Sequence, residues 1–225
     1  MSRFVEFKYL LRRQGVVLGL IAFLAAVLLV QTFASYDFTL RFSAMPAEIV
    51  SAWNSIRSGV FTASVGEELL TLLTAGLLHS DIGHLLGNML FLWIFAAVAC
   101  ELLGSRWVAA VFIFTAITGN ICHVAMNPES TAICLGASGA VMGFEGLYLA
   151  MAVRWSLPDP HVQPMARPVN PGSLAVIGII SLVFDFNGYI SGGECIAYGA
   201  HLGGFIGGLF LGGFVVPMPR VALPR

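Results

Sequence analysis

Six apolar stretches constrain the possible folds of this chain more than any other feature of its sequence. Each approaches the length of about 20 residues at which an apolar helix crosses a bilayer. They cover residues 15–34, 82–102, 107–124, 137–153, 172–190 and 196–216. The fifth is the weakest, because its uninterrupted apolar core ends at Phe184, before Asp185 and Asn187. The pattern predicts an all-α membrane protein built as a bundle of six transmembrane helices.

The composition agrees with this class and argues against others. Hydrophobic residues make up 58% of the chain and charged residues only 10%, against about 45–50% and 25% in soluble domains. The net charge is −1, and no basic block suggests that the protein binds nucleic acid. The four cysteines form no CxxC or zinc-binding spacing. We expect no cofactor and no metal.

The placement of basic residues predicts the orientation. If the N-terminus is inside, nine of the 11 Lys and Arg residues lie in cytoplasmic segments, and only Arg41 and Arg57 lie outside. This matches the positive-inside rule, so both termini are expected in the cytoplasm. The first stretch is longer than the apolar core of a signal peptide, so we interpret it as an uncleaved anchor.

The predicted topology divides the chain into three parts. Residues 1–14 form a cytoplasmic tail, residues 15–216 form the six-helix domain, and residues 217–225 form a second cytoplasmic tail. The largest connection is an outer loop over residues 35–81, in which two segments have helix-like apolar spacing. We expect these helices to lie in the membrane interface. Cys122, Cys134 and Cys195 fall near the outer face, where either a disulfide or packed thiols would be compatible with the pattern.

Polar side chains gather at the outer ends of the second, fourth and sixth stretches, which all run inwards from the outer face. The second stretch begins near His79, His84 and Asn88, the fourth carries Ser138, and the sixth carries His201. With a rise of about 1.5 Å per residue, all of them lie in the outer third of the membrane.

Glycines explain how the fourth and sixth helices could approach closely. Small residues at intervals of three or four make smooth helix faces in membranes. One such set accompanies Ser138 (Gly139, Gly143, Gly146) and another accompanies His201 (Ala200, Gly204, Gly208, Gly212). We therefore expect the Ser138 hydroxyl to reach a nitrogen of His201.

A serine beside a histidine indicates nucleophilic catalysis, because the hydroxyl needs a base to become reactive. No acid emerges as a third member, so we predict a Ser138–His201 dyad. Attack on a carbonyl creates an oxyanion that needs donors. His84 and Asn88, four residues apart on one helix face, could supply them together with the N-terminal N–H groups of the Ser138 helix. The alternative for His84 and Asn88 is hydrogen bonding between helices.

These residues resemble those of the rhomboid family of intramembrane serine proteases over about residues 67–212. The matching motifs are His79-x4-His84-x3-Asn88, Gly136-Ala-Ser138-Gly139 and Ala200-His201-x2-Gly204-x3-Gly208. The resemblance implies a six-helix bundle whose dyad cleaves a peptide bond in or beside a substrate's transmembrane segment. It also implies an oxyanion hole formed by His84, Asn88 and the backbone N–H of Ser138.

The chain departs from the family pattern at two places. Many members have an aromatic residue where this chain has Met142, and we expect its thioether to fill the same space. Many also have a Trp-Arg pair in the outer loop where this chain has Leu70-Thr71.

Glu145 matches no motif, although a carboxylate near the bilayer centre costs roughly 2.5–3.5 kcal/mol. It could be a protonated acid hydrogen-bonded inside the bundle or an ion site of a six-span transporter. Asn120 and His123 are interpreted as structural groups.

The motifs leave three functions open. Intramembrane proteolysis on single-pass or polytopic membrane proteins is favoured, because an inactive rhomboid-like protein that binds membrane clients needs neither Ser138 nor His201. The third candidate function is a six-span transporter that uses Glu145. The partners expected are membrane protein substrates and the lipid bilayer, and the expected location is a bacterial plasma (inner) membrane.

Overall fold

The computed structural model describes residues 3–158, 170–190 and 197–224, although not every side chain within these ranges. Most of these residues lie in helices. The long N-terminal helix α1 spans Arg3–Phe33 and therefore includes most of the segment that we assigned to a cytoplasmic tail. The other helical elements in the described residues are α2 (Tyr36–Phe42), α3 (Pro46–Arg57), α4 (Ala63–Thr74), the 3₁₀ turn η1 (Ala75–Leu77), α5 (Ile82–Leu103), α6 (Ser105–Met126), α7 (Ser138–Arg154), α8 (Pro171–Ile190), α9 (Tyr198–Phe210) and the π-helical turn η2 (Leu211–Val215).

Local chemistry explains several boundaries. Pro46 occupies the first turn of α3, where a missing N–H costs nothing. The Thr62 hydroxyl accepts a hydrogen bond from Val65 N at the start of α4, and the Asp81 carboxylate accepts one from His84 N at the start of α5. Gly104, with φ of +94°, makes the tight connection between α5 and α6.

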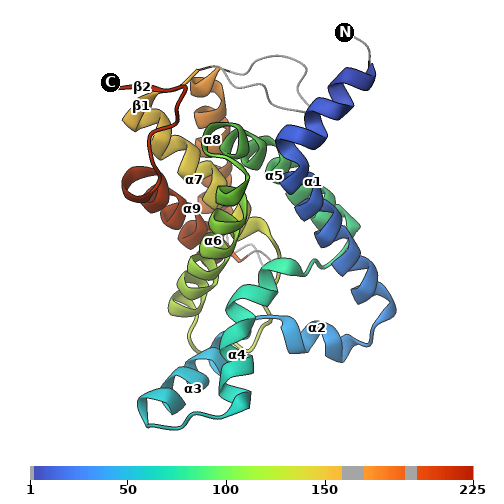
Figure 1. Cartoon of the computed structure of the whole chain (residues 1–225). Coiled ribbons are helices and arrows are strands. Elements are labelled where there is room, and N and C mark those ends of the chain that lie inside the picture. The colour runs from blue at the N-terminus through green and yellow to red at the C-terminus, as the bar shows by residue number, and fades with distance from the viewer. Residues whose placement is uncertain (1–2, 159–169, 191–196, 225) are drawn as a thin grey trace.

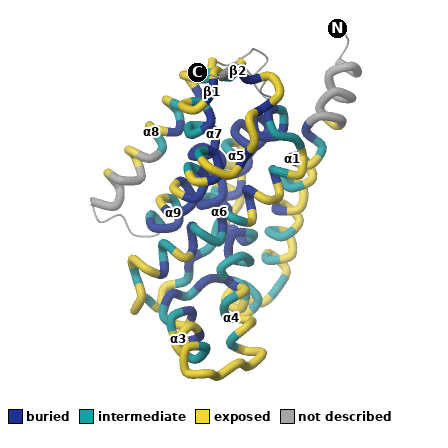
Figure 2. The backbone as a smooth tube through the Cα atoms, turned by 60° about the vertical axis from the view of Figure 1, so that its left-hand side comes forward, coloured by how far each residue is buried: buried dark blue, intermediate teal, exposed yellow. Residues whose placement is uncertain are grey.

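Helix α7 lies at the centre of the bundle, surrounded by α5, α6, α8 and α9 (Figure 1). Every residue from Gly139 to Tyr148 is buried, as the dark segment in Figure 2 shows. Phe144, Leu147 and Met151 anchor the main hydrophobic core. Helix α1 packs mainly on α5 at the edge of the bundle.

In the part of the chain that the structure describes, four helices are long and apolar enough to cross a membrane: Gln14–Phe33 within α1, α5, α6, and Tyr198–Val215 over α9 and η2. Helices α7 and α8 are not among them, since α7 has 17 residues and α8 has a shorter apolar part, Pro171–Ser181. The six predicted stretches thus coincide with six helices, but the structure supports four membrane spans.

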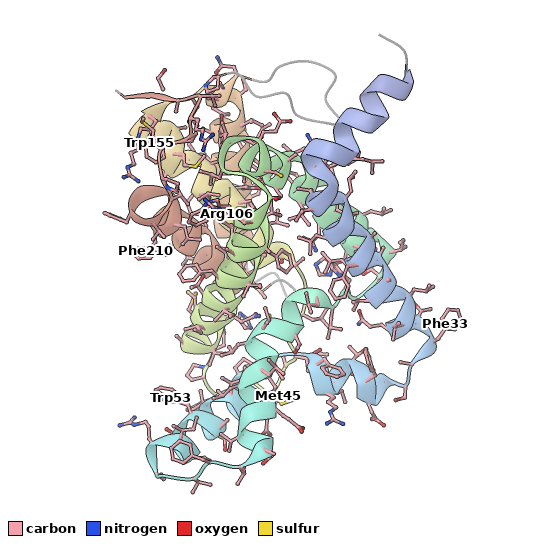
Figure 3. The ribbon with its side chains drawn as sticks, in the orientation of Figure 1. Phe33, Met45, Trp53, Arg106, Trp155 and Phe210 are labelled. Carbon is pink, nitrogen blue, oxygen red and sulfur yellow. The ribbon has the colours of Figure 1, made fainter. Side chains whose placement is uncertain are left out.

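Large apolar side chains cover the outside of the bundle, as expected where lipid replaces water. Phe33 and Phe210, labelled in Figure 3, point outwards from α1 and α9 and are exposed. Exposed isoleucines and valines continue this surface on α6 and α8. The protein is a multi-pass membrane protein.

The expected helices of the outer loop are present as α3 and α4, which form a hairpin at the end of the molecule opposite the two chain termini (Figure 1). A short antiparallel strand pair, which was not expected, lies at the end of the molecule that holds the two termini. It is formed by β1 (Trp155–Ser156) and β2 (Leu223–Pro224). This pair holds the C-terminal segment against the end of α7.

Candidate active site

Ser138 and His201 lie side by side at the start of two neighbouring helices. Ser138 is the first residue of α7, and His201 lies in the first turn of α9. Ser138 Oγ is 2.7 Å from His201 Nε2, within hydrogen-bonding distance. Both residues are half-buried.

Glycines bring the two helices to backbone contact. A Cβ atom at Gly204 would lie 2.7 Å from the carbonyl carbon of Gly139, and one at Gly208 would lie 2.7 Å from the carbonyl carbon of Gly143. Real Cβ atoms essentially never approach so closely. Any side chain at these positions would therefore separate α9 from α7.

Helix α9 has a second glycine face, which the sequence reasoning missed. A Cβ at Gly199 would lie 2.7 Å from His123 Cα, and one at Gly203 would lie 2.5 Å from the carbonyl oxygen of Thr118, both on α6. The spacing of Gly199, Gly203 and Gly207 in the sequence was the available signal. Close packing on two sides restricts the position of His201.

The segment before Ser138 is held by a backbone contact. Gly136 N donates a hydrogen bond to the carbonyl oxygen of Ala75, at a distance of 2.9 Å. Gly136 has φ of +130°, and a Cβ there would lie 2.7 Å from His84 Cε1 and 3.7 Å from Ser138 Oγ. Only glycine lets the His84 ring lie against this segment beside the serine.

A short hydrogen-bonded chain orients His84. Its Nδ1 lies 3.1 Å from Ser80 Oγ, and the Ser80 hydroxyl also lies within 2.8 Å of Asp81 Oδ2. The His84 N–H and the Ser80 hydroxyl donate to Asp81 and lower the pKa of this carboxyl group. Ser80 was not predicted, although its position four residues before His84 on the approach to a capped helix was a usable signal.

Asn88 lies one turn after His84 and is buried, with 7% of its surface exposed. Among the residues that the structure describes, its Nδ2 has no hydrogen-bond partner. A buried N–H group without a partner costs about 1–3 kcal/mol. Such a group at the wall of a cavity can donate a hydrogen bond to an acceptor atom of a ligand.

Ser138, His201, His84 and Asn88 share one cavity of about 360 Å³. It is lined by Ser80, Gly83, His84, Gly87, Asn88, Leu135, Ser138, Ala197 and His201. A larger hollow of about 970 Å³ shares Ser80, His84, Leu135 and Ala197 with it and extends to the loop between α6 and α7. Thr131 and Ala132 of that loop are exposed, so water has a path to the dyad.

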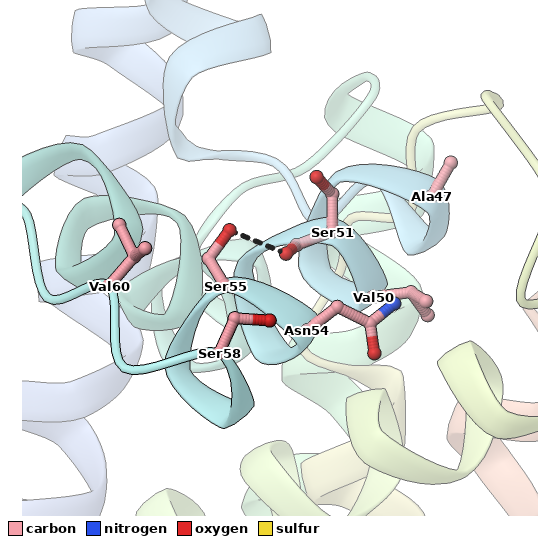
Figure 4. Close-up of a pocket in the computed structure, with 7 residues that line it drawn as sticks. All are labelled: Ala47, Val50, Ser51, Asn54, Ser55, Ser58 and Val60. Atoms are coloured by element: carbon pink, nitrogen blue, oxygen red, sulfur yellow. Dashed lines mark hydrogen bonds between the residues drawn. The ribbon is translucent and has the colours of Figure 1, made fainter.

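A separate hollow of about 470 Å³ lies on α3 and the turn that follows it (Figure 4). Its polar groups are hydroxyl and amide side chains, and Ser55 Oγ donates to the Ser51 carbonyl oxygen at 3.0 Å. Among the described residues, neither a histidine nor an acidic residue lines it, so they offer no base for a nucleophile.

His79, which lies between η1 and α5, is tied to α1 through its backbone. Gln31 accepts a hydrogen bond from His79 N at 3.1 Å and donates one to His79 O at 3.3 Å. The ring is buried and meets the His84 ring edge-on at 5.3 Å between centroids. Burial and the neighbouring His84 lower the pKa of His79 to about 4, so this ring is neutral at pH 7.

The other polar residues singled out in the sequence have varied surroundings. Asn120 donates to the carbonyl oxygen of Leu72 at 2.9 Å, a structural bond between α6 and α4. His123 Nδ1 lies 3.5 Å from Asn127 Nδ2 near the end of α6. Glu145 is buried within the bundle, with 2% of its surface exposed.

Cys100 and Cys134 are buried and Cys122 is half-buried, and these three described cysteines form no disulfide with one another. Cys195 lies outside the described residues, so a disulfide that includes it stays an open alternative. Within the ranges that the structure describes, no cluster of three or more His, Cys, Asp or Glu residues could hold a metal ion.

At the positions where the sequence departs from the family pattern, Met142 is buried and lines a cavity together with His201. Leu70 is exposed, and the Thr71 hydroxyl donates to the Glu68 carbonyl oxygen.

The chain is similar in sequence to known proteins of one family. The sequence model of the Rhomboid domain matches residues 66–218. The chain is 32% identical over 112 residues to the rhomboid-family protein YdcA of Bacillus subtilis, covering 50% of this chain and 56% of that protein. It is 33% identical over 141 residues to the rhomboid protease GluP of the same organism, covering 62% of this chain and 24% of GluP.

A mitochondrial presenilin-associated rhomboid-like protein of Mus musculus is 26% identical over 156 residues, covering 67% of this chain and 40% of that protein. The chain thus matches between about a quarter and just over half of the length of these relatives. Because the domain match covers most of the chain and includes every residue of the site, the chain belongs to the rhomboid family.

Proposed function

We propose that the protein is an intramembrane serine endopeptidase that cleaves a peptide bond in or next to a transmembrane segment of its substrate. The observation that carries this proposal is the 2.7 Å separation between Ser138 Oγ and His201 Nε2 in a cavity with a path to water. Two of the relatives, including GluP, are named as rhomboid proteases, while other members carry only the family name.

The first step is attack of Ser138 Oγ on the substrate carbonyl carbon. His201 must carry its ring proton on Nδ1, so that Nε2 accepts the proton of the serine hydroxyl. A bond forms between Oγ and the carbonyl carbon, and the carbonyl oxygen becomes an oxyanion. When the C–N bond breaks, the nitrogen leaves as an amine that takes the proton from His201. Water then attacks the acyl-enzyme by the same route and frees Ser138.

The oxyanion would be held by His84, Asn88 and the N–H of Ser138. The free Asn88 Nδ2 is available for this contact among the described residues, and the N-terminus of α7 favours negative charge. In its charged state His84 can donate through Nε2 while Nδ1–H donates to Ser80 and the Ser80 hydroxyl donates to Asp81. In the neutral state Nε2 can donate only if the Ser80 hydroxyl turns from Asp81 to donate to Nδ1.

The membrane setting follows from the same proposal. Helix α7 at the centre of the bundle and α8 at its edge would cross the bilayer beside the four longer spans, giving six spans with both termini in the cytoplasm. The dyad would then lie near the outer face of a bacterial plasma membrane. Substrates would be membrane proteins whose helix is weak near that face, because a packed helix hides its carbonyl groups from attack.

The test uses the full chain, purified in detergent and reconstituted in liposomes with a single-pass membrane substrate. We expect one cleavage product, identified by mass spectrometry, that disappears in both Ser138→Ala and His201→Ala. A fluorophosphonate probe should label Ser138 in the wild type.

The matched control is Ser51→Ala, which removes a hydroxyl from the exposed face of α3 and should leave cleavage unchanged. If cleavage persists in Ser138→Ala, the assignment of the nucleophile is wrong. If the wild type binds membrane proteins but cleaves none and its Ser138 is not labelled, the protein is an inactive member of the family.

A further inference from the structure

Gln31 joins the C-terminal end of α1 to the segment that leads into α5. Its Oε1 accepts a hydrogen bond from His79 N at 3.1 Å, and its Nε2 donates to His79 O at 3.3 Å. The same Nε2 also donates to the Thr39 hydroxyl at 3.4 Å. An amide side chain has two N–H donors and a carbonyl acceptor, so both kinds of group are in use. Because Gln31 binds both backbone groups of His79, it fixes the position of this residue relative to α1.

His79 is followed directly by the two residues that orient His84. Ser80 Oγ lies 3.1 Å from His84 Nδ1, and Asp81 Oδ1 accepts a hydrogen bond from His84 N at 2.9 Å. The ring of His79 also meets the His84 ring edge-on, with 5.3 Å between centroids, a distance at which aromatic rings are in contact. Three consecutive residues therefore hold His84, and Gln31 holds the first of them.

Helix α1 lies at the edge of the bundle (Figure 1), and only 17% of its apolar stretch Gln14–Phe33 is buried, against 67% in α5. A second glutamine attaches its other end to α5. Gln14 Nε2 donates to Glu101 Oε1 at 3.0 Å, and Gln14 Oε1 accepts a hydrogen bond from Trp93 Nε1 at 3.1 Å. With a rise of about 1.5 Å per residue, Gln31 lies about 25 Å further along α1. The two glutamines thus attach opposite ends of one helix, and only Gln31 is bonded to the segment that carries the site.

Loss of the contact at Gln31 would release this segment. Backbone N–H and C=O groups away from water need partners, so without Gln31 the peptide at His79 would move to find others. Ser80 and Asp81 would move with it, and the ring of His84 with them. A shift of about 1 Å in a catalytic group can lower the rate about 10²-fold.

We propose that Gln31 is a positioning residue, which acts through the backbone of His79 to hold His84 in place for the oxyanion. The inference rests on the proposed function, because it assigns a role in the same reaction. It deepens that function by giving α1 a part in catalysis, although α1 precedes the matched Rhomboid domain at residues 66–218.

The experiment compares Gln31→Met with the wild type, as full chains in liposomes with a single-pass substrate. Methionine is unbranched like glutamine, but its thioether cannot donate a hydrogen bond and accepts only weakly. We expect kcat and kcat/KM to fall together at least about tenfold, as they do when an interaction made only in the transition state is lost. Gln31→Asn, which keeps the amide on a shorter side chain, is the second variant and should also lower kcat.

Gln14→Met is the matched control, because it makes the same change at the other end of the same helix. It should lower the unfolding temperature but leave kcat unchanged, since Gln14 has no contact with the segment before α5 among the bonds that the structure describes. Thermal unfolding in detergent shows that each variant is folded at the temperature of the assay.

A double-mutant cycle with His84 separates positioning from a general loosening of the bundle. In His84→Ala the ring that Gln31 positions is absent, so adding Gln31→Met should lower kcat less than about twofold. The dyad and Asn88 remain in this background, so that slow cleavage can still be measured.

An unchanged kcat in folded Gln31→Met and Gln31→Asn overturns the inference. Equal losses of kcat in Gln31→Met and Gln14→Met overturn it as well, and so does a full effect of Gln31→Met in the His84→Ala background. All three results leave the protease assignment standing, because the wild type still cleaves. Absence of Ser138-dependent cleavage by the wild type refutes both proposals.

Discussion

The contact between α7 and α9 makes a quantitative prediction for Gly208→Ala. The new Cβ would lie 2.7 Å from the carbonyl carbon of Gly143 and 2.8 Å from Leu147 N. Carbon atoms pack at about 3.5–4.0 Å, so the helices must move apart by roughly 1 Å. Both obstructing atoms belong to the backbone, so no side-chain rotation relieves the overlap.

Two consequences follow for Gly208→Ala. Overpacking of this kind costs about 1–3 kcal/mol of the free energy of unfolding. Displacement of α9 would also lengthen the 2.7 Å separation between Ser138 and His201, and a shift of about 1 Å in catalytic geometry can lower the rate about 10²-fold. Thermal unfolding in detergent measures the first effect, and initial cleavage rates in liposomes measure the second.

Gly213→Ala provides the matched control, because it makes the same change five residues further along, in η2, where a Cβ would meet nothing within 4 Å. Its stability and rate should stay close to those of the wild type. If Gly208→Ala behaves like Gly213→Ala in both assays, then backbone contact between α7 and α9 does not position the dyad. The argument from glycine packing would then be wrong.

Two further predictions concern the outer end of the site. Burial and His84 lower the pKa of His79 from 6.5 to about 4; between these pH values the unfolded chain binds a proton that the folded protein does not. The unfolding temperature of the wild type should therefore fall as the pH is lowered from about 6.5 towards 4. In His79→Gln this dependence on pH should be weaker. If the variant and the wild type have the same dependence, the prediction is wrong. Gly136→Ala should displace His84 and reduce kcat about 10²-fold. Gly59→Ala has a similar strain at φ of +80° with open space around it, and should lower stability alone; equal activity in the two variants would contradict the prediction.

Much of this architecture could be predicted from the sequence because lipid imposes strong local rules. A helix in hydrocarbon must be long and apolar, so the six stretches coincide with α1 and α5 to α9. Small residues at regular intervals indicate which helix faces can touch. The order of His84, Ser138 and His201 on helices that run in one direction placed them at one depth.

Only the tertiary structure decided which neighbouring helix each of those faces contacts. Helical periodicity says which residues share a face, but the rotation of each helix depends on all of its neighbours at once. For this reason the contact of the second glycine face of α9 with α6 and the hydrogen bond between Ser80 and His84 were missed. The pairing of β1 with β2, which joins segments far apart in the sequence, was missed as well. The same reason applies to Glu145, which the sequence marked as an unexplained charge. The packing of α8 against α7 places it in the wall of a cavity that Ser138 also lines.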